Sequence, residues 1–229
     1  MKYLILDCGG VIAYPRLGDW TLPFRAAELL GPRARDLYTG KYLAAHRHCA
    51  RWLDESRLVA NVEEERVLRR EYIREMSEQM GWNLSQADIL RLGDDFTDNC
   101  QRYGFFEDVE PWLGRWKQRY GLGLLSDAMP SMLAFMNQRG LLKLFDAAVI
   151  STQVGALKPD PRMYNAICDA LKAEPGDCLF VDDRICNLEG AVNAGMKAAQ
   201  MARAAFLPDA LWDGPVVHDF KELNGLIEA

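Results

Sequence analysis

The chain has 229 residues, a net charge of −6 at neutral pH and 49% hydrophobic residues. This length suits one large domain or a core with a smaller insertion, and the apolar content is that of a globular protein with a sizeable core. The acidic balance argues against nucleic acid as a partner, and no apolar run approaches the roughly 20 residues that span a bilayer.

The cysteines and the N-terminus indicate a compartment. The six cysteines show neither CxxC spacing nor a dense framework, which favours reduced thiols. The segment 1–7 reaches a carboxylate too early for a secretory signal. We therefore expect a cytoplasmic protein that binds neither nucleic acid nor membrane. The sequence does not indicate its oligomeric state.

Short apolar runs alternate with helical stretches in the second half of the chain, which predicts a parallel sheet covered by helices. The expected strands are 3–6, 122–125, 147–150, 178–181 and 198–201, with a short edge strand at 216–218. The expected helices are 109–120, 131–139, 161–171 and 187–194. Gly121 and Gly140 follow two of these helices, where a left-handed residue is expected to end the helix.

The stretch from about Tyr14 to Tyr103 has no convincing strand and repeats apolar residues at three- and four-residue steps. Charged residues around this apolar stripe, Arg69 among them, are expected to be solvated. The stripe itself comprises Val62, Leu68, Tyr72, Met76 and Met80. We predict an all-helical domain at 14–103, inserted into an α/β core formed by 1–13 and 104–229.

Four segments of the predicted core carry polar side chains that suit chemistry. They contain Asp7, followed by Gly9 and Gly10; Ser126 with Asp127; Lys158; and the pair Asp182 and Asp183. The segments with Asp7, with Ser126 and with Asp182 follow predicted strands. The segment with Lys158 lies in a turn before a helix. Because the carboxyl ends of parallel strands meet at one edge of a sheet, we expect these side chains to converge there.

The residue types indicate phosphoryl transfer. Asp7, Asp182 and Asp183 offer hard oxygen ligands suited to Mg²⁺, and no His or Cys cluster has zinc spacing. Ser126 and Lys158 would hold a phosphate as a hydroxyl donor and a point charge, with Asp7 free to form an aspartyl-phosphate. Singly, each feature also fits a helix cap, a turn hydroxyl or a surface lysine. Their combination in this order favours the chemical interpretation.

These residues, in this order, resemble the motifs of the haloacid-dehalogenase superfamily of aspartate-nucleophile hydrolases. The fourth segment, with Asp182-Asp183 and the later Asn187, is similar to that of the subgroup that contains small-molecule phosphatases. The resemblance covers about residues 1–13 and 105–229. It implies a Rossmann-like, doubly wound parallel sheet with a helical cap inserted after the first motif.

The resemblance also implies roles for the residues. Asp7 matches the nucleophile, and Ser126 and Lys158 match the hydroxyl and the lysine of the second and third motifs. Asp182 and Asp183 match the metal-binding acids of the fourth. The carbonyl of Gly9 takes the place of a backbone metal ligand. The implied cofactor is Mg²⁺ and the implied substrate is a small phosphorylated metabolite.

Two residues depart from the family pattern. Gly9 stands where most of the phosphatases carry a general acid and base, whose help is worth about 10²–10⁴ in rate. Activity is then expected to be weak, or directed to substrates with good leaving groups such as acyl phosphates or sugar 1-phosphates. Asp127 stands where asparagine is usual. It could enter the site as a substrate-binding carboxylate, pair with Arg184, or replace the missing acid; His46 is another candidate proton donor.

The leading hypothesis is a Mg²⁺-dependent phosphatase. Gly9 and Asp127 also motivate a non-catalytic alternative, in which the protein binds a phosphorylated ligand or a partner. A metal-independent 2-haloacid dehalogenase is less favoured, because that branch typically has an aromatic residue at the position of Gly9 and lacks the pair Asp182-Asp183.

Overall fold

The computed structural model describes residues 1–55, 59–204 and 212–228, and the chain folds into two compact units. The sheet unit comprises Met1–Tyr14, Gly104–Ala128 and Met132–Ala229. The helical unit comprises Pro15–Tyr103 together with Met129–Ser131. That the helical unit acts as a cap stays a prediction.

A six-stranded sheet forms the centre of the sheet unit, in the order β5-β4-β1-β6-β7-β8. Every neighbouring pair is parallel, and β1 is central, between β4 and β6. The strands are β1 (Tyr3–Leu6), β4 (Gly121–Ser126), β5 (Ala147–Ile150), β6 (Cys178–Asp182), β7 (Lys197–Met201) and β8 (Val216–Val217). Apolar residues without alternation suit strands that are buried on both faces.

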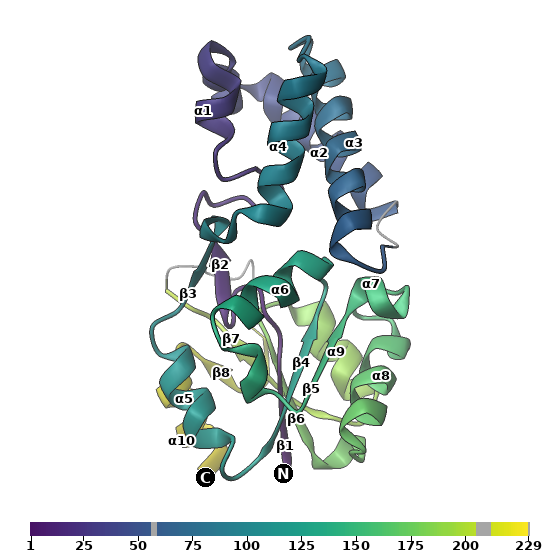
Figure 1. Cartoon of the computed structure of the whole chain (residues 1–229). Coiled ribbons are helices and arrows are strands. Elements are labelled where there is room, and N and C mark those ends of the chain that lie inside the picture. Colours follow the sequence, from purple (N-terminus) through teal and green to yellow (C-terminus); the bar gives the residue numbers. More distant parts are fainter. Residues whose placement is uncertain (56–58, 205–211, 229) are drawn as a thin grey trace. The chain divides into compact units, whose positions relative to one another are not determined.

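Helices cover both faces of this sheet, with α5 and α10 on one side and α8 and α9 on the other (Figure 1). The helices that follow β3 (Tyr103–Phe105) are α5 (Val109–Trp116), α6 (Pro130–Gln138), η3 (Leu142–Leu144), α7 (Ser151–Val154), α8 (Pro161–Leu171), η4 (Pro175–Asp177), α9 (Ile185–Asn193) and α10 (Phe220–Glu228). The predicted Rossmann-like, doubly wound α/β fold is confirmed. Phe180 of β6 and Tyr164 of α8 are fully buried and meet edge to face at 5.8 Å, which fixes α8 on the sheet.

The helical unit is built from helices with clear end signals. They are α1 (Ala26–Leu30), η1 (Gly31–Tyr38), α2 (Gly40–Glu55), α3 (Val62–Met80), α4 (Gln86–Asp98) and η2 (Cys100–Arg102). The side chain of Asn61 accepts a hydrogen bond from the Glu64 N–H at the start of α3, and Gly81 ends it with φ 68°. None of the helices in the described part of the chain is long and apolar enough to cross a membrane.

The stripe predicted on α3 is only partly correct. Tyr72, Met76 and Met80 lie in the core of the helical unit, whereas Val62 and Leu68 are only partly buried. Arg69, expected in solvent, is 5% exposed. Its guanidinium lies 4.4 Å from the centre of the Phe96 ring and 3.5 Å from the carboxylate of the fully buried Glu65. An aromatic face and a carboxylate thus compensate the burial of its charge.

Two local expectations were wrong. Gly121 does not end a helix, because α5 already ends at Trp116 and Gly121 begins β4. A Cβ at Gly121 would lie 2.5 Å from the Tyr3 ring, which explains why glycine stands there. The small two-stranded sheet of β2 (Ala13–Pro15) and β3 (Tyr103–Phe105) was not predicted. Gly140 has the expected left-handed backbone, with φ 71°.

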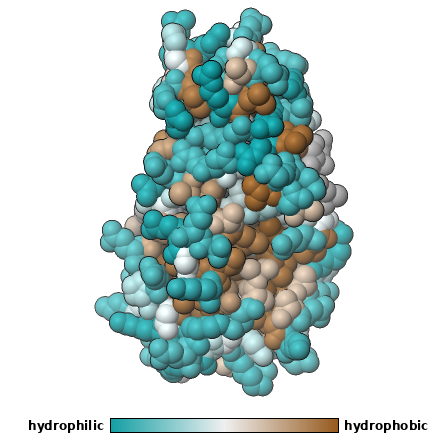
Figure 2. Space-filling model, in the orientation of Figure 1, coloured by the Kyte–Doolittle hydropathy of each residue, from teal (hydrophilic) through white to brown (hydrophobic). Residues whose placement is uncertain are grey.

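The exposed surface mixes hydrophilic and hydrophobic residues. On the face shown in Figure 2, hydrophobic residues gather near the middle and hydrophilic residues surround them. The described large hydrophobic residues with high exposure are Leu17, Tyr38, Leu43, Val67 and Val192. Single apolar residues on a surface are normal for a globular protein.

Candidate active site

The sheet register brings two of the predicted acids level with each other. Leu6, the last residue of β1, pairs with Leu124 of β4 and Val181 of β6. The next residue, Asp7, donates its backbone N–H to the Val181 carbonyl at 2.9 Å. Asp182 ends β6 beside it. Both carboxylates therefore leave the same edge of the sheet from adjacent strands.

Lys158 joins these two acids. Its Nζ donates to Oδ1 of Asp7 at 2.7 Å and to Oδ2 of Asp182 at 2.6 Å. The same ammonium donates to the Leu125 carbonyl at 3.2 Å, so three acceptors surround it. The side chain of Lys158 is 1% exposed. A buried ammonium group with two carboxylate partners is held in place by charge-assisted hydrogen bonds.

Burial and charge set the protonation of these groups. Burial alone would lower the pKa of Lys158, but the negative charges of Asp182 and Asp7 outweigh it and raise that pKa. Burial raises the pKa of Asp7 to about 6, against the opposing charge of Lys158. Burial, then the charges of Asp7 and Asp182, raises the pKa of Asp183 to about 8. Lys158 is thus a permanent cation, while the acids hold more negative charge than one lysine balances.

The paired aspartates have different surroundings. Asp182 accepts hydrogen bonds from Lys158, from the Asn187 amide at 3.0 Å and from the Arg184 N–H at 2.8 Å. Both oxygens of Asp182 therefore already accept hydrogen bonds. Asp183 is partly exposed, and its carboxylate lies against Gly10, where a Cβ would be 2.6 Å from Oδ2. Only glycine fits at that point, and its φ of 70° also favours glycine.

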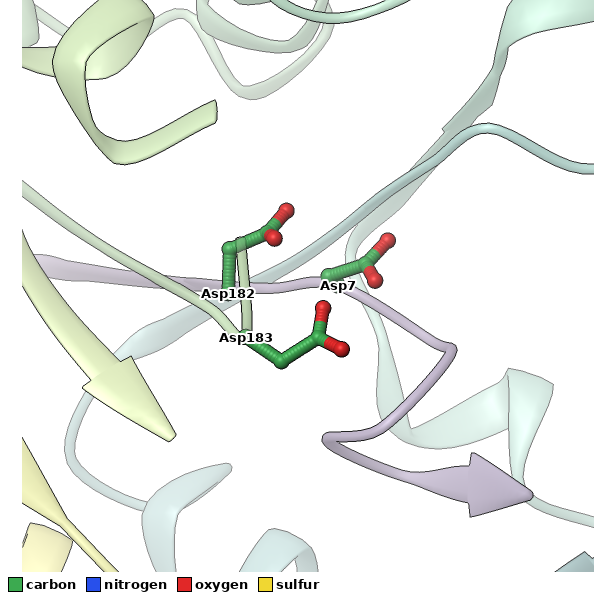
Figure 3. A group of neighbouring side chains, drawn as sticks. All are labelled: Asp7, Asp182 and Asp183. Atoms are coloured by element: carbon green, nitrogen blue, oxygen red, sulfur yellow. The ribbon is translucent and has the colours of Figure 1, made fainter. Parts of the chain in front are cut away.

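The three acids could hold a metal ion. One oxygen each from Asp7, Asp182 and Asp183 lies within 4.8 Å of the others. The side chains of Asp182 and Asp183 both extend toward Asp7 (Figure 3). When all three carboxylates are ionised, they and the ammonium leave two negative charges, which a divalent cation would balance. Hard oxygen donors without nitrogen or sulfur suit Mg²⁺.

The second segment is placed by the same sheet. Ser126 ends β4 and pairs with Ile150 of β5, and it is 4% exposed. The Asp127 carboxylate accepts a hydrogen bond from the Lys158 N–H at 3.0 Å. Asp127 thus holds the backbone of the residue whose ammonium joins Asp7 and Asp182.

The loop after Asp7 is a compact turn. Its Ile12 and Ala13 N–H groups donate to the Cys8 carbonyl, and Gly10 N–H donates to the Ala13 carbonyl. Among the described residues, no hydrogen bond reaches the carbonyl of Gly9. That oxygen is therefore not committed to the turn, as a metal-ligating carbonyl requires.

The structure adds two residues to which the sequence assigned no role. Asn187 anchors Asp182, and its place in the fourth motif could have indicated this. Arg203, which follows β7, donates to the Val11 carbonyl within the loop after Asp7. No signal in the sequence marks Arg203, because it lies in none of the four segments that carry the motifs.

Comparisons with known proteins support the family. The chain matches the family model of haloacid dehalogenase-like hydrolases over residues 1–195. It is 31% identical over 156 residues to a protein of Mycobacterium tuberculosis named a phosphatase, a match that covers 63% of this chain and 68% of that protein. It is 39% identical over 70 residues to the bifunctional epoxide hydrolase 2 of Mus musculus, which covers 31% of this chain and 12% of that one.

Solved structures share the fold over the whole chain. A HAD phosphatase from Thermococcus onnurineus has a TM-score of 0.64 at 20% identity, covering 99% of this chain and 98% of that chain. The L-2-haloacid dehalogenase of Xanthobacter autotrophicus has a TM-score of 0.71 at 17% identity, covering 100% and 99%. These identities show the fold alone. With the family match over residues 1–195, the chain belongs to the haloacid dehalogenase-like hydrolases.

Proposed function

We propose that this hydrolase is a Mg²⁺-dependent phosphatase of small phosphorylated metabolites, with Asp7 as nucleophile. The observation that carries the proposal is the position of Lys158, which joins Asp7 to Asp182 at 2.7 and 2.6 Å beside a third carboxylate, Asp183. This arrangement concentrates both a nucleophile and compensating positive charge at one strand edge.

The residues present suit the implied cation. Asp7, Asp183 and the Gly9 carbonyl are the best candidates to hold it, because Asp182 is already bound by Lys158 and two other donors. When bound, Mg²⁺ would neutralise phosphate oxygens and draw the phosphate to a site that is otherwise negative. In this proposal Asp182 serves mainly to fix Lys158.

The proposed reaction has two steps, the formation of an aspartyl-phosphate on Asp7 and its hydrolysis. An oxygen of Asp7 attacks phosphorus, the bond to the leaving oxygen breaks with its electron pair, and an aspartyl-phosphate forms. The positive charge of Lys158 and the Ser126 hydroxyl stabilise the phosphoryl oxygens as charge moves to the leaving group. The oxygen of a water molecule then attacks phosphorus, and the bond from phosphorus to the Asp7 oxygen breaks with its electron pair. The Asp7 carboxylate is regenerated, and the inorganic phosphate that leaves carries the protons of the water.

The substrate class follows from Gly9. A glycine provides no proton for the leaving oxygen, so an alkyl alcohol would depart as a poor leaving group. Acyl phosphates and sugar 1-phosphates need less help and are the substrates we favour. Among the matched proteins, several are named phosphatases, which supports the reaction class without identifying the substrate.

A matched pair of assays tests the proposal. Hydrolysis of p-nitrophenyl phosphate and acetyl phosphate is measured for wild type and Asp7→Asn, with and without Mg²⁺. We expect hydrolysis by wild type only with Mg²⁺, faster for acetyl phosphate, and loss of at least 10³-fold in Asp7→Asn. Equal background rates for the two proteins would instead support the non-catalytic alternative. Halide release from a 2-haloacid without added metal would support the dehalogenase.

A further inference from the structure

Arg203, which follows β7, contacts the loop after Asp7, which comprises residues 8–13. Its Nε and Nη2 donate to the Val11 carbonyl at 3.0 and 2.9 Å. Its Nη1 donates to both oxygens of Asp108 at 2.8 and 2.9 Å. The guanidinium lies 4.1 Å from the centre of the Phe106 ring and 4.8 Å from that of Phe220. At 5% exposure, it is a buried cation whose described contacts include a backbone carbonyl, a carboxylate and two aromatic rings.

The loop that Arg203 contacts, residues 8–13, is anchored at both ends. Before it, Asp7 N–H donates to the Val181 carbonyl, and at its end Ala13 begins β2, which pairs with β3. Between these ends, the Cys8 and Ala13 carbonyls accept hydrogen bonds from within the loop, and the Ile12 carbonyl accepts from the Phe106 N–H. The bidentate bond from Arg203 to Val11 therefore fixes the middle of the loop.

That part of the loop touches the candidate metal site. Val11 follows Gly10, whose backbone lies close enough to Asp183 that an added Cβ would be 2.6 Å from Oδ2. It also lies two positions from Gly9, the proposed carbonyl ligand. A shift of the Val11 carbonyl would move Gly9 and Gly10 with it, because the turn Cys8–Ala13 is closed by its own hydrogen bonds.

We infer that Arg203, oriented by Asp108, is a positioning residue that holds the Gly9 carbonyl and the Gly10–Asp183 contact in the geometry that binds the cation. The inference rests on the proposed function, since it assumes that Asp7, Asp183 and Gly9 bind Mg²⁺. Outer groups that orient metal ligands typically change metal affinity by about 10–100-fold when removed.

Calorimetric titration of the substrate-free full chain with Mg²⁺ tests the inference, with urea unfolding measured in parallel without metal. The variants are Arg203→Met, Arg203→Lys, Asp108→Asn and the double variant Arg203→Met with Asp108→Asn. The control is Arg119→Met, which removes an exposed arginine paired with Glu228. Arg203→Lys and Asp108→Asn keep a charge or a hydrogen bond, so they remain informative if Arg203→Met does not fold.

We expect Arg203→Met to bind Mg²⁺ about tenfold or more weakly, Arg203→Lys and Asp108→Asn to bind with intermediate affinity, and Arg119→Met to match wild type. The double variant should bind no more weakly than Arg203→Met, because Asp108 acts through Arg203. Unchanged Mg²⁺ affinity in the folded Arg203 and Asp108 variants, with only their stability lowered, would overturn the inference. Absence of Mg²⁺ binding by wild type would overturn the proposed function, and the inference with it.

Discussion

Asp127 occupies a position for which the sequence left three hypotheses open. Its carboxylate accepts the Lys158 N–H at 3.0 Å, and this contact needs an acceptor oxygen but no charge. An asparagine has that oxygen, whereas a leucine would leave the N–H without its acceptor. The contact therefore favours a role in holding Lys158 over a role as the missing acid.

We accordingly predict that Asp127→Asn keeps phosphatase activity within about threefold of wild type. In Asp127→Leu the free energy of unfolding should fall by about 1–3 kcal/mol and activity should be lost, because the Lys158 N–H loses its acceptor. Steady-state rates and urea unfolding of the two variants check this. A loss of the acidic limb of the pH–rate profile in Asp127→Asn would show that the carboxyl group transfers a proton after all.

Asp183 makes stability depend on pH in an unusual direction. Burial raises its pKa to about 8, so the folded protein keeps a proton that the unfolded chain, with a pKa near 4, releases. Between these values the folded state binds more protons, and the free energy of unfolding must fall as pH rises. Asp7, with its pKa raised to about 6, adds to the same slope in the lower part of this window.

We predict that wild type without metal loses stability between about pH 5 and pH 8. In Asp183→Asn the free energy of unfolding should decrease less over this range. Mg²⁺ should stabilise wild type more at pH 8 than at pH 5. Urea unfolding across this range measures all three. The variant is needed because the pKa of His46, raised by its hydrogen bond to Asp19, tilts the curve in the same direction. A slope in Asp183→Asn as steep as in wild type would contradict the assignment.

At the scale of elements, the turn after β1 depends on glycine for two separable reasons. Gly10 has φ 70° and lies against Asp183, while Gly140, with φ 71°, would bring a Cβ no closer than 3.7 Å to the Lys143 side chain. Alanine at either position meets the same backbone strain, of about 1–2 kcal/mol. Only at Gly10 does it also displace a carboxylate.

Gly10→Ala should therefore destabilise the protein by more than Gly140→Ala and, unlike Gly140→Ala, weaken Mg²⁺ binding by about tenfold. Urea unfolding of both variants measures the cost in stability, and calorimetric titration with Mg²⁺ measures the effect of the contact between residue 10 and Asp183. Equal effects of the two substitutions on Mg²⁺ affinity would remove Gly10 from the site.

The elements could largely be predicted because their patterns are strong. The buried strands 3–6 and 147–150 and the helix 161–171 match the structure at both ends. The errors have physical causes. The strands of three residues, β2 and β3, are too short to show a period. Arg69 is buried because Phe96 and Glu65 compensate its charge, and neither contact can be inferred from helical spacing.

The topology of the whole molecule explains why the convergence of the site's side chains was easier to predict than the contacts that support them. Parallel strands deliver their carboxyl ends to one edge, so Asp7, Lys158 and Asp182 could be expected to meet before any distance was known. Arg203 reaches the loop after Asp7 from the segment after β7, and Asp108, just before α5, binds Arg203. Such packing depends on tertiary contacts that no local pattern encodes.

The two units have separate cores, and this predicts a localised response to metal. The core of the helical unit includes Tyr72 and Phe96, and that of the sheet unit includes Ile5 and Phe180. Mg²⁺ at about 100 times its dissociation constant should stabilise the unit that binds it by about 2.7 kcal/mol. Hydrogen exchange should therefore slow in β1 and β6 and change less in α3. Equal protection of α3 would show that the units unfold together.

The central claim is that Asp7 carries the phosphoryl group. Its most direct test is a rapid acid quench of wild type turning over acetyl phosphate with Mg²⁺, followed by mass spectrometry of the proteolytic peptides. We predict a phosphoryl group on the peptide that contains Asp7, absent without Mg²⁺ and absent in Asp7→Asn. Turnover of acetyl phosphate with no modified peptide at any quench time, or with the group on another residue, would contradict the account.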